Sequence, residues 1–217
     1  MKKAKDLMPE LVDLSNFVDC EVSSLHLDSR EVKDGGVFFA VKGINQNGMD
    51  FIQEAKSKGA KLIISEELVE DSSVIHCSNL KKLLGKFTSR FYSNSSEELT
   101  TFCVTGTNGK TTAVEAYSSI CSSIGKKCGY LSTVGKSIDG IAVKDPYSLT
   151  TPDIISLNTS LYEMLLNGAT HAAFEASSHG LDQGRLSGVS IDYAVLTSFS
   201  HCLLYTSDAA DEGLGVD

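Results

Sequence analysis

The stretch Thr105-Gly106-Thr107-Asn108-Gly109-Lys110-Thr111-Thr112 decides the fold of this 217-residue chain. It follows the apolar run 100–105, which is typical of a buried strand, and it precedes segment 111–124, which is typical of a helix that ends at Gly125. Two glycines let the backbone approach a ligand closely, and the amides and dipole at a helix start attract an anion. We therefore expect Gly106, Thr107, Asn108, Gly109, Lys110, Thr111 and Thr112 to bind the phosphates of ATP.

Two side chains indicate a phosphate-binding loop rather than a simple glycine turn. Lys110 is placed to reach the terminal phosphates, and the Thr111 hydroxyl is placed to ligate Mg²⁺. The loop departs from the common pattern G-x-x-x-x-G-K-[ST], because Val104 stands where that pattern has its first glycine. A plain turn between strand and helix is the alternative, but it does not require a lysine and a threonine in register at the helix start.

The rest of the chain alternates strand and helix patterns around this loop. Short apolar runs predict strands over 37–41, 61–65, 73–77, 127–132, 171–176 and 193–197, and periodic segments predict helices over 51–58, 80–92 and 154–167. The polar, serine-rich segment 92–98 is the best boundary candidate. We expect the α/β class: a small α/β domain over residues 1–94, then a P-loop domain with a mostly parallel sheet over residues 95–201.

Composition and charge exclude several classes of protein. The net charge of −9 and the pI near 5.0 argue against sequence-independent binding to nucleic acid or to an anionic membrane. No apolar run is long enough to cross a bilayer, and no signal peptide follows the basic N-terminus. The six cysteines form no C-x-x-C pair, so we expect reduced thiols and a cytoplasmic protein.

Beyond the loop, three segments carry a family resemblance. The loop itself resembles the ATP loop of the Mur ligases and of their folylpolyglutamate synthetase relatives. Residues 27–30 together with 36–43, residues 149–153, and above all residues 175–185 (Glu-Ala-Ser-Ser-His-Gly-Leu-Asp-Gln-Gly-Arg) resemble the Mur ligase that adds the third peptide residue. The resemblance runs from about residue 25 to residue 201.

The resemblance implies a reaction and its partners. ATP would phosphorylate the D-glutamate carboxylate of UDP-N-acetylmuramoyl-L-alanyl-D-glutamate, and the amine of a diamino acid, meso-diaminopimelate or L-lysine, would attack the acyl phosphate. ATP and Mg²⁺ are the implied cofactors, and a monomer is the family default. The small first domain would bind the UDP-muramoyl group.

The resemblance also implies roles for particular residues. Lys110 and Glu175 would be catalytic, with Thr111 and Glu175 as the magnesium ligands. The implied contacts to the UDP-muramoyl dipeptide are Leu27, Ser29, Ile44, Asn45, Gln46, Thr150, Thr151, Ser177, Gln183 and Arg185. Some of these residues have a structural alternative: neighbouring amides for Glu175, a surface salt bridge for Arg185, and turn chemistry for Thr150, Thr151 and the loop 44–46.

The histidines suggest no further chemistry. His179 follows two serines, but no nucleophile elbow surrounds them, and the ligase reaction needs no covalent serine. His26, His76 and His171 lack metal-ligand spacing, so core or surface positions are the simpler interpretation.

The segment from Cys202 onward departs from the family. Relatives continue with an Asp-His pair and then a carbamylated lysine, whereas Cys202-Leu203 stands here and residues 202–212 resemble a translated sequencing adapter. We expect residues 202–217 to be a non-native tail, with a divergent natural C-terminus as the alternative, and we expect the chain as written to be inactive alone. A folylpolyglutamate or cyanophycin synthetase and a non-catalytic nucleotide-binding module remain the competing functions.

Overall fold

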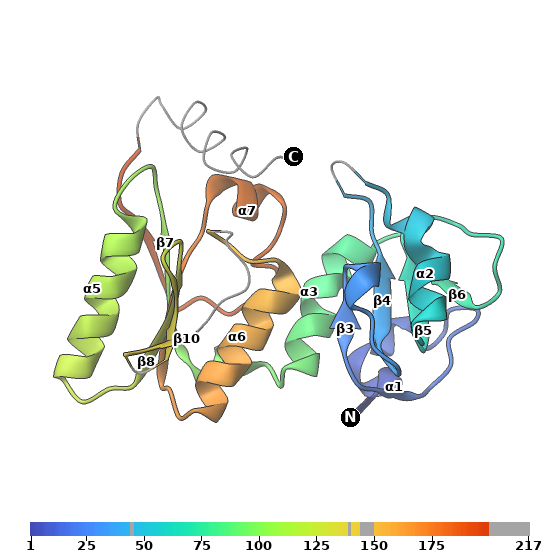
Figure 1. Cartoon of the computed structure of the whole chain (residues 1–217), viewed down its shortest axis with the longest axis horizontal. Coiled ribbons are helices and arrows are strands. Elements are labelled where there is room, and N and C mark those ends of the chain that lie inside the picture. Colours follow the sequence, from blue (N-terminus) through green and yellow to red (C-terminus); the bar gives the residue numbers. More distant parts are fainter. Residues whose placement is uncertain (44–45, 139, 144–149, 200–217) are drawn as a thin grey trace. The chain divides into compact units, whose positions relative to one another are not determined.

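A computed structural model describes residues 1–43, 46–138, 140–143 and 150–199. The chain divides into two compact units, Met1–Phe91 and Tyr92–Asp217, and Figure 1 shows both. Each unit contains its own sheet and its own buried apolar residues.

The first unit is built on a four-stranded parallel sheet in the order β3-β4-β5-β6. Its strands are β3 (Leu25–His26), β4 (Val37–Ala40), β5 (Leu62–Ser65) and β6 (Val74–His76). A small antiparallel pair joins β1 (Lys2–Lys3) to β2 (Glu21–Val22). The helices are α1 (Ala4–Leu7), α2 (Ile52–Ser57) and α3 (Leu80–Phe91), with 3₁₀ turns at Pro9–Leu11, Ser29–Glu31 and Gly48–Phe51.

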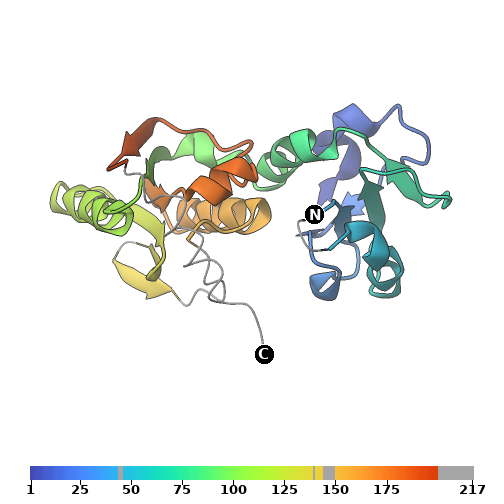
Figure 2. The ribbon, with the colours of Figure 1, turned by 90° about the horizontal axis from the view of Figure 1, so that it is seen from above.

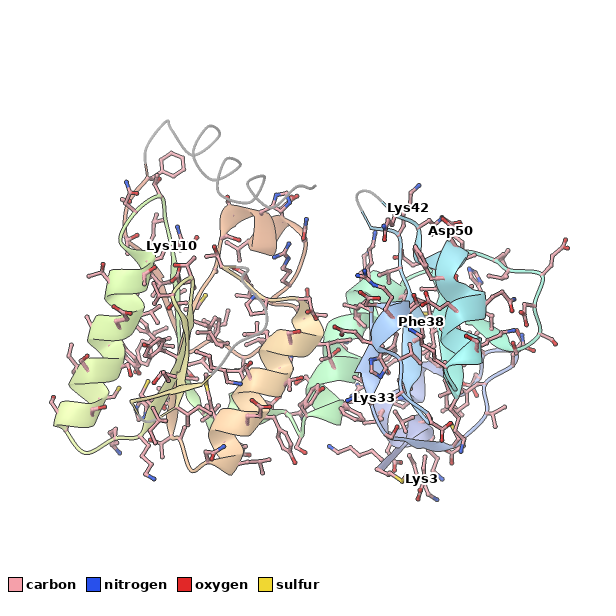
Figure 3. All side chains as sticks on the ribbon, viewed as in Figure 1. Lys3, Lys33, Phe38, Lys42, Asp50 and Lys110 are labelled. Carbon is pink, nitrogen blue, oxygen red and sulfur yellow. The ribbon has the colours of Figure 1, made fainter. Side chains whose placement is uncertain are left out.

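Helices cover both faces of this sheet, so its strands are mostly apolar. Phe38, labelled in Figure 3, and Ile63 pack with Ile52 of α2 on one face. On the other face, Phe39 stacks on Phe87 of α3 with ring centroids 6.5 Å apart. All four residues of β4 are buried, which explains why its sequence is a continuous apolar run rather than an alternating one.

The second unit contains a six-stranded sheet in the order β10-β9-β8-β11-β7-β12. Strands β8 (Cys128–Ser132), β11 (His171–Glu175), β7 (Thr100–Thr105) and β12 (Tyr193–Leu196) are parallel. Strands β9 (Gly135–Ile138) and β10 (Ile141–Val143) add an antiparallel hairpin. In Figure 2 this yellow hairpin and the red strand β12 lie at opposite edges of the sheet.

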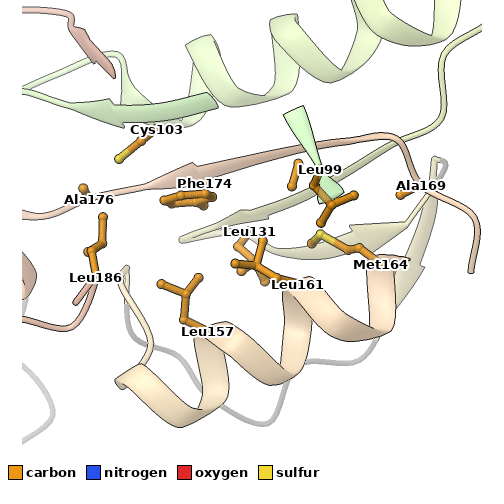
Figure 4. Packing of buried hydrophobic residues seen from close by; sticks show 11 residues of the cluster. Leu99, Cys103, Leu131, Leu157, Leu161, Met164, Ala169, Phe174, Ala176 and Leu186 are labelled. Atoms are coloured by element: carbon orange, nitrogen blue, oxygen red, sulfur yellow. The ribbon is translucent and has the colours of Figure 1, made fainter. Parts of the chain in front are cut away.

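Helices α5 (Lys110–Ser123) and α6 (Ile154–Leu166) lie on opposite faces of this sheet in Figure 1. On the α6 face, Leu157, Leu161 and Met164 pack onto Leu131 and Phe174, as Figure 4 shows. The remaining helices are α4 (Ser95–Glu98) and α7 (Ser178–Asp182). This arrangement is the expected doubly wound α/β fold, and it brings the carboxyl ends of four parallel strands to one edge of the sheet.

The predicted strands and helices are confirmed to within two residues of their ends. The hairpin β9–β10 is missing from the prediction, because the short segment 135–143 has no clear alternating pattern. The prediction also lacks the short elements β1, β2, β3, α1, α4 and α7, which are five residues long or shorter. Among the described residues, no helix is long and apolar enough to cross a membrane.

Candidate nucleotide and acceptor site

The loop after β7 is held tightly against the end of β12. Gly106 has a φ of +136°, and a Cβ on it would lie 2.4 Å from Thr197 Oγ1 and 2.9 Å from both the N and the O of Ser198. Thr107 N donates to Ser198 O (3.0 Å), and Thr197 Oγ1 donates to Asn108 O (2.6 Å). Gly106 is therefore required by close packing and by a left-handed backbone together.

Gly109, with a φ of +86°, begins helix α5. The first backbone hydrogen bond of the helix runs from Ala113 N to Gly109 O (3.0 Å). The N–H groups of Lys110, Thr111 and Thr112 therefore precede the helix's own hydrogen-bond ladder and are directed out of the helix start. Such a group of amides at the positive end of a helix dipole suits a phosphate.

The Lys110 ammonium is folded back over its own loop. Lys110 Nζ donates to Gly106 O (2.7 Å) and to Thr107 O (3.4 Å), and Figure 3 shows Lys110 at the start of α5. The lysine thus carries a positive charge to the loop where the amides converge. A bound phosphate would compete with these two carbonyls for its protons.

Glu175 ends β11 beside this loop, with a side chain that is buried to 1% exposure. Its Oε1 accepts from Thr111 Oγ1 (2.7 Å) and from Thr133 N (3.0 Å). Its Oε2 is buried and has no hydrogen-bond partner in the described part of the chain. A neighbouring amide therefore satisfies only one of the two oxygens, and the unpartnered Oε2 beside the Thr111 hydroxyl fits a magnesium ligand.

Thr133 is a site residue that the sequence analysis missed. It follows β8, which pairs in parallel with β11, and its hydroxyl lies 3.1 Å from Thr111 Oγ1. Because parallel strands bring their carboxyl ends to one edge, a polar residue just after the predicted strand 127–132 was a detectable signal.

Four residues that were expected to contact the UDP-muramoyl dipeptide lie around the corner between β11 and α7. They are called the acceptor residues below, because the carboxylate of that substrate would accept the phosphoryl group. Ser177 Oγ accepts from Gly180 N (3.0 Å) and so begins α7. Arg185 donates from Nη1 to Thr151 O (2.6 Å) and from Nε to Gln183 Oε1 (2.9 Å). The structure places these four predicted residues together, and it shows no acidic partner for Arg185 among the described residues, contrary to the surface salt-bridge alternative.

A cavity of about 500 Å³ joins the two groups of residues. Its walls include the predicted residues 106–111, Thr150, Glu175 and Ser177, and also Thr133, Ser178, His179, Leu181, Leu196 and Phe199. Four predicted residues do not line this cavity: Thr112, which is exposed on α5, and Thr151, Gln183 and Arg185.

The first unit holds the remaining predicted contacts. Leu27 is half-buried, and Gln46 is exposed. Ser29 is buried, and its hydroxyl donates to Glu54 Oε2 (2.5 Å). Ile44 and Asn45 lie outside the described residues. Leu27 and Ser29 lie just before and within the 3₁₀ turn Ser29–Glu31 of the first unit.

The histidines His26 and His171 and the cysteines of the described residues lie outside the candidate site. Burial lowers the pKa of His26, whose ring also bonds Ser24, and burial lowers the pKa of His171. Burial raises the pKa of the Cys103 thiol to about 11. The five cysteines of the described residues are all free. No cluster of three or more metal-binding side chains of the His, Cys, Asp and Glu types occurs in that part of the chain.

The glycine loop, the lysine at the helix start and the buried carboxylate on the neighbouring strand define a P-loop nucleotide-binding protein. Two family descriptions narrow this class: "Mur ligase middle domain" matches residues 104–202, and "Mur ligase family, catalytic domain" matches residues 21–92. The chain belongs to the Mur ligase family.

Similar proteins agree with this assignment. The chain is 37% identical to the UDP-N-acetylmuramoyl-L-alanyl-D-glutamate–2,6-diaminopimelate ligase of Cytophaga hutchinsonii over 91% of its own length and 42% of that protein. It is 39% identical to the enzyme of the same name from Rickettsia conorii, over 85% and 39%. The chain thus spans about two fifths of the length of these relatives.

Solved structures show the same fold. A structure of a UDP-N-acetylmuramoyl-L-alanyl-D-glutamate–2,6-diaminopimelate ligase aligns with a TM-score of 0.78 at 30% identity, over 94% of this chain and 42% of that one. The MurF ligase of Thermotoga maritima in complex with ADP aligns with a TM-score of 0.56 at 26% identity, over 82% and 38%.

Proposed function

We propose that the protein containing this chain is an ATP-dependent amide ligase of peptidoglycan precursor synthesis. It would join a diamino acid to the D-glutamate carboxylate of UDP-N-acetylmuramoyl-L-alanyl-D-glutamate. The observation that carries the proposal is the buried, unpartnered Oε2 of Glu175 beside Thr111 and Lys110, in a cavity that also reaches Ser177. The names of the relatives favour 2,6-diaminopimelate as the diamino acid.

In this proposal the loop residues bind and orient ATP. The amides of residues 110–112 and the Lys110 ammonium would hold the phosphates, after Lys110 leaves the carbonyls of Gly106 and Thr107. Thr111 Oγ1 and Glu175 Oε2 would hold Mg²⁺, which would neutralise charge on the transferring phosphoryl group. The positive charge of Lys110 then stabilises the developing negative charge on the γ-phosphate oxygens.

The acceptor carboxylate would enter from the side of Ser177 and α7. Its oxygen attacks the γ-phosphorus, ADP leaves, and an acyl phosphate forms. The amine of the diamino acid attacks the acyl carbon, and the tetrahedral intermediate expels phosphate to leave the amide. Arg185, with a guanidinium already oriented by Thr151 and Gln183, supplies a fixed positive charge near that path.

The first unit would hold the uridine end of the substrate. Leu27, Ser29 and Gln46 are the candidates among the described residues. Ile44 and Asn45, which precede Gln46 in the sequence, are the other two candidates. Since the reaction consumes ATP, we propose a cytoplasmic location. We propose a monomer as the simplest assembly.

The proposal is tested by binding and by chemistry. Calorimetry on the purified chain should detect a non-hydrolysable ATP analogue whose affinity rises with Mg²⁺. It should also detect UDP-N-acetylmuramoyl-L-alanyl-D-glutamate in preference to UDP-N-acetylmuramic acid without the dipeptide. The product of the complete reading frame should release phosphate only when ATP, the UDP-dipeptide and a diamino acid are all present. Binding of folate substrates in place of the UDP-dipeptide would contradict the proposal.

A further inference from the structure

Thr151 occupies an unusual place between the two halves of the site. Its side chain is buried to 1% exposure. Its Oγ1 accepts from Ser177 N (2.8 Å) and also lies 3.2 Å from both Glu175 O and Ser177 Oγ. One hydroxyl thus connects the backbone on both sides of Ala176, between the nucleotide carboxylate and the first acceptor residue.

The main chain of Thr151 makes a second connection. Its carbonyl accepts from Arg185 Nη1 (2.6 Å), while Gln183 Oε1 accepts from Arg185 Nε (2.9 Å) and Nη2 (2.6 Å). The guanidinium is therefore clamped on two sides by neutral oxygens. Its charge is oriented but not neutralised, as a carboxylate-binding arginine requires.

Thr151 packs closely against Gly180 of α7. A Cβ added to Gly180 of α7 would lie 2.8 Å from Thr151 Cβ and 2.9 Å from Thr151 Cγ2. Gly180 N also donates to Ser177 Oγ, so α7, Ser177 and Thr151 form one packed group. A shift of any member displaces the others, because close-packed groups transmit such displacements.

We infer that Thr151 is a positioning residue that couples the nucleotide half of the site to the acceptor half, rather than a residue that contacts substrate through its side chain. This inference rests on the proposed function for the identity of the two ligands. Because the Thr151 hydroxyl holds the Glu175–Ser177 corner, order imposed by one ligand favours the geometry that the other ligand needs. Such coupling is reciprocal, so each ligand raises the affinity for the other by the same factor.

Three variants of the whole chain test this role. Thr151→Val keeps the side-chain shape and removes the hydroxyl, whereas Thr151→Ser keeps the hydroxyl. Thr159→Val is the matched control, since that half-buried hydroxyl donates to Ile155 O (2.8 Å) on α6, away from the cavity. Calorimetry measures the affinity for a non-hydrolysable ATP analogue with Mg²⁺ and for the UDP-muramoyl dipeptide, each alone and with the other at saturation.

Thr151→Val should weaken both ligands by about tenfold or more, since Ser177 N loses a buried acceptor. It should also abolish the mutual enhancement, while Thr151→Ser and Thr159→Val retain it. Wild-type affinities in Thr151→Val, or loss of affinity for one ligand with the other unchanged, would overturn the inference. An equal loss in Thr151→Ser would also overturn it, because the hydroxyl would then be irrelevant.

Amide hydrogen exchange separates this inference from the proposed function. In the ligand-free chain, Thr151→Val should accelerate exchange at Ser177 and across α7, while α5 keeps the wild-type rate. If the wild-type chain binds no UDP-dipeptide, the proposed substrate is wrong, and the exchange result still decides the role of Thr151. Unchanged exchange at Ser177 and α7 would refute the positioning role.

Discussion

Replacing Gly106 with alanine should disable the phosphate loop while leaving the rest of the second unit folded. The added Cβ would lie 2.4 Å from Thr197 Oγ1 and 2.9 Å from two backbone atoms of Ser198. Thr197 is not free to retreat, because its hydroxyl donates to Asn108 O (2.6 Å) and to Thr105 O (3.2 Å). The loop must therefore move away from β12.

The size of the effect follows from these contacts. Alanine at a φ of +136° carries a strain of about 1–3 kcal/mol. Moving the loop also breaks the bond from Thr107 N to Ser198 O (3.0 Å), at about 0.5–1.5 kcal/mol. If nucleotide binding requires the displaced loop to return at a cost of about 2 kcal/mol, the affinity for nucleotide falls about 30-fold.

Gly125→Ala provides the matched control for this prediction. Gly125 follows the other end of the same helix with a φ of +73°, but an added Cβ there would meet nothing within 4 Å. This variant should lower the unfolding temperature by a few degrees through backbone strain alone, and it should bind nucleotide normally. The assays are thermal unfolding and calorimetric titration of a non-hydrolysable ATP analogue with Mg²⁺.

Two results would refute the reasoning. Gly106→Ala with wild-type nucleotide affinity would show that the close approach of β12 does not shape the loop. An equal loss of affinity in Gly125→Ala would show that general destabilisation of α5, rather than crowding at the loop, controls binding.

Three further predictions concern charge and thiol chemistry. Lys110→Ala should weaken nucleotide binding about tenfold or more in the same titration, because a charge beside the phosphates is lost, whereas Lys110→Arg should retain part of the affinity; equal affinities in both variants would contradict this. The hydrogen bond from Arg90 holds the pKa of Glu10 below its ordinary value of about 4.3, so the pair stabilises the first unit above that value, and the stabilisation disappears as the pH falls through the lowered pKa. Glu10→Gln should therefore show a shallower loss of unfolding free energy on acidification, measured by urea titration at several pH values; a slope equal to that of the wild type would reject the role of this pair. Among the five described cysteines, Cys20 is the only one that is not buried, so it should be alkylated first in the native chain, whereas Cys103, with a pKa raised to about 11, should react only on unfolding, as peptide mass mapping would show; early modification of Cys103 would indicate that the core opens locally.

The sequence by itself determined the class of fold and the location of the nucleotide loop. Both depend on local chemistry: apolar runs form strands, amphipathic segments form helices, and two glycines with a lysine at a helix start form a phosphate loop wherever the strand and helix are placed. The resemblance of residues 175–185 likewise needed no coordinates. The hairpin β9–β10 was not predicted from the sequence, because its stability comes from pairing with β8 rather than from its own pattern.

Only the tertiary structure decided how the loop is completed. Gly106 must be a glycine because Thr197 and Ser198, about 90 residues later in the chain, pack against it, and no local pattern records that contact. The surroundings of Glu175 also depend on the tertiary structure. Its Oε1 accepts hydrogen bonds from Thr111 and Thr133, and its Oε2 has no hydrogen-bond partner among the described residues. The burial of Thr151 and its hydrogen bond from Ser177 N also depend on which elements meet in space, and sequence spacing does not encode that meeting.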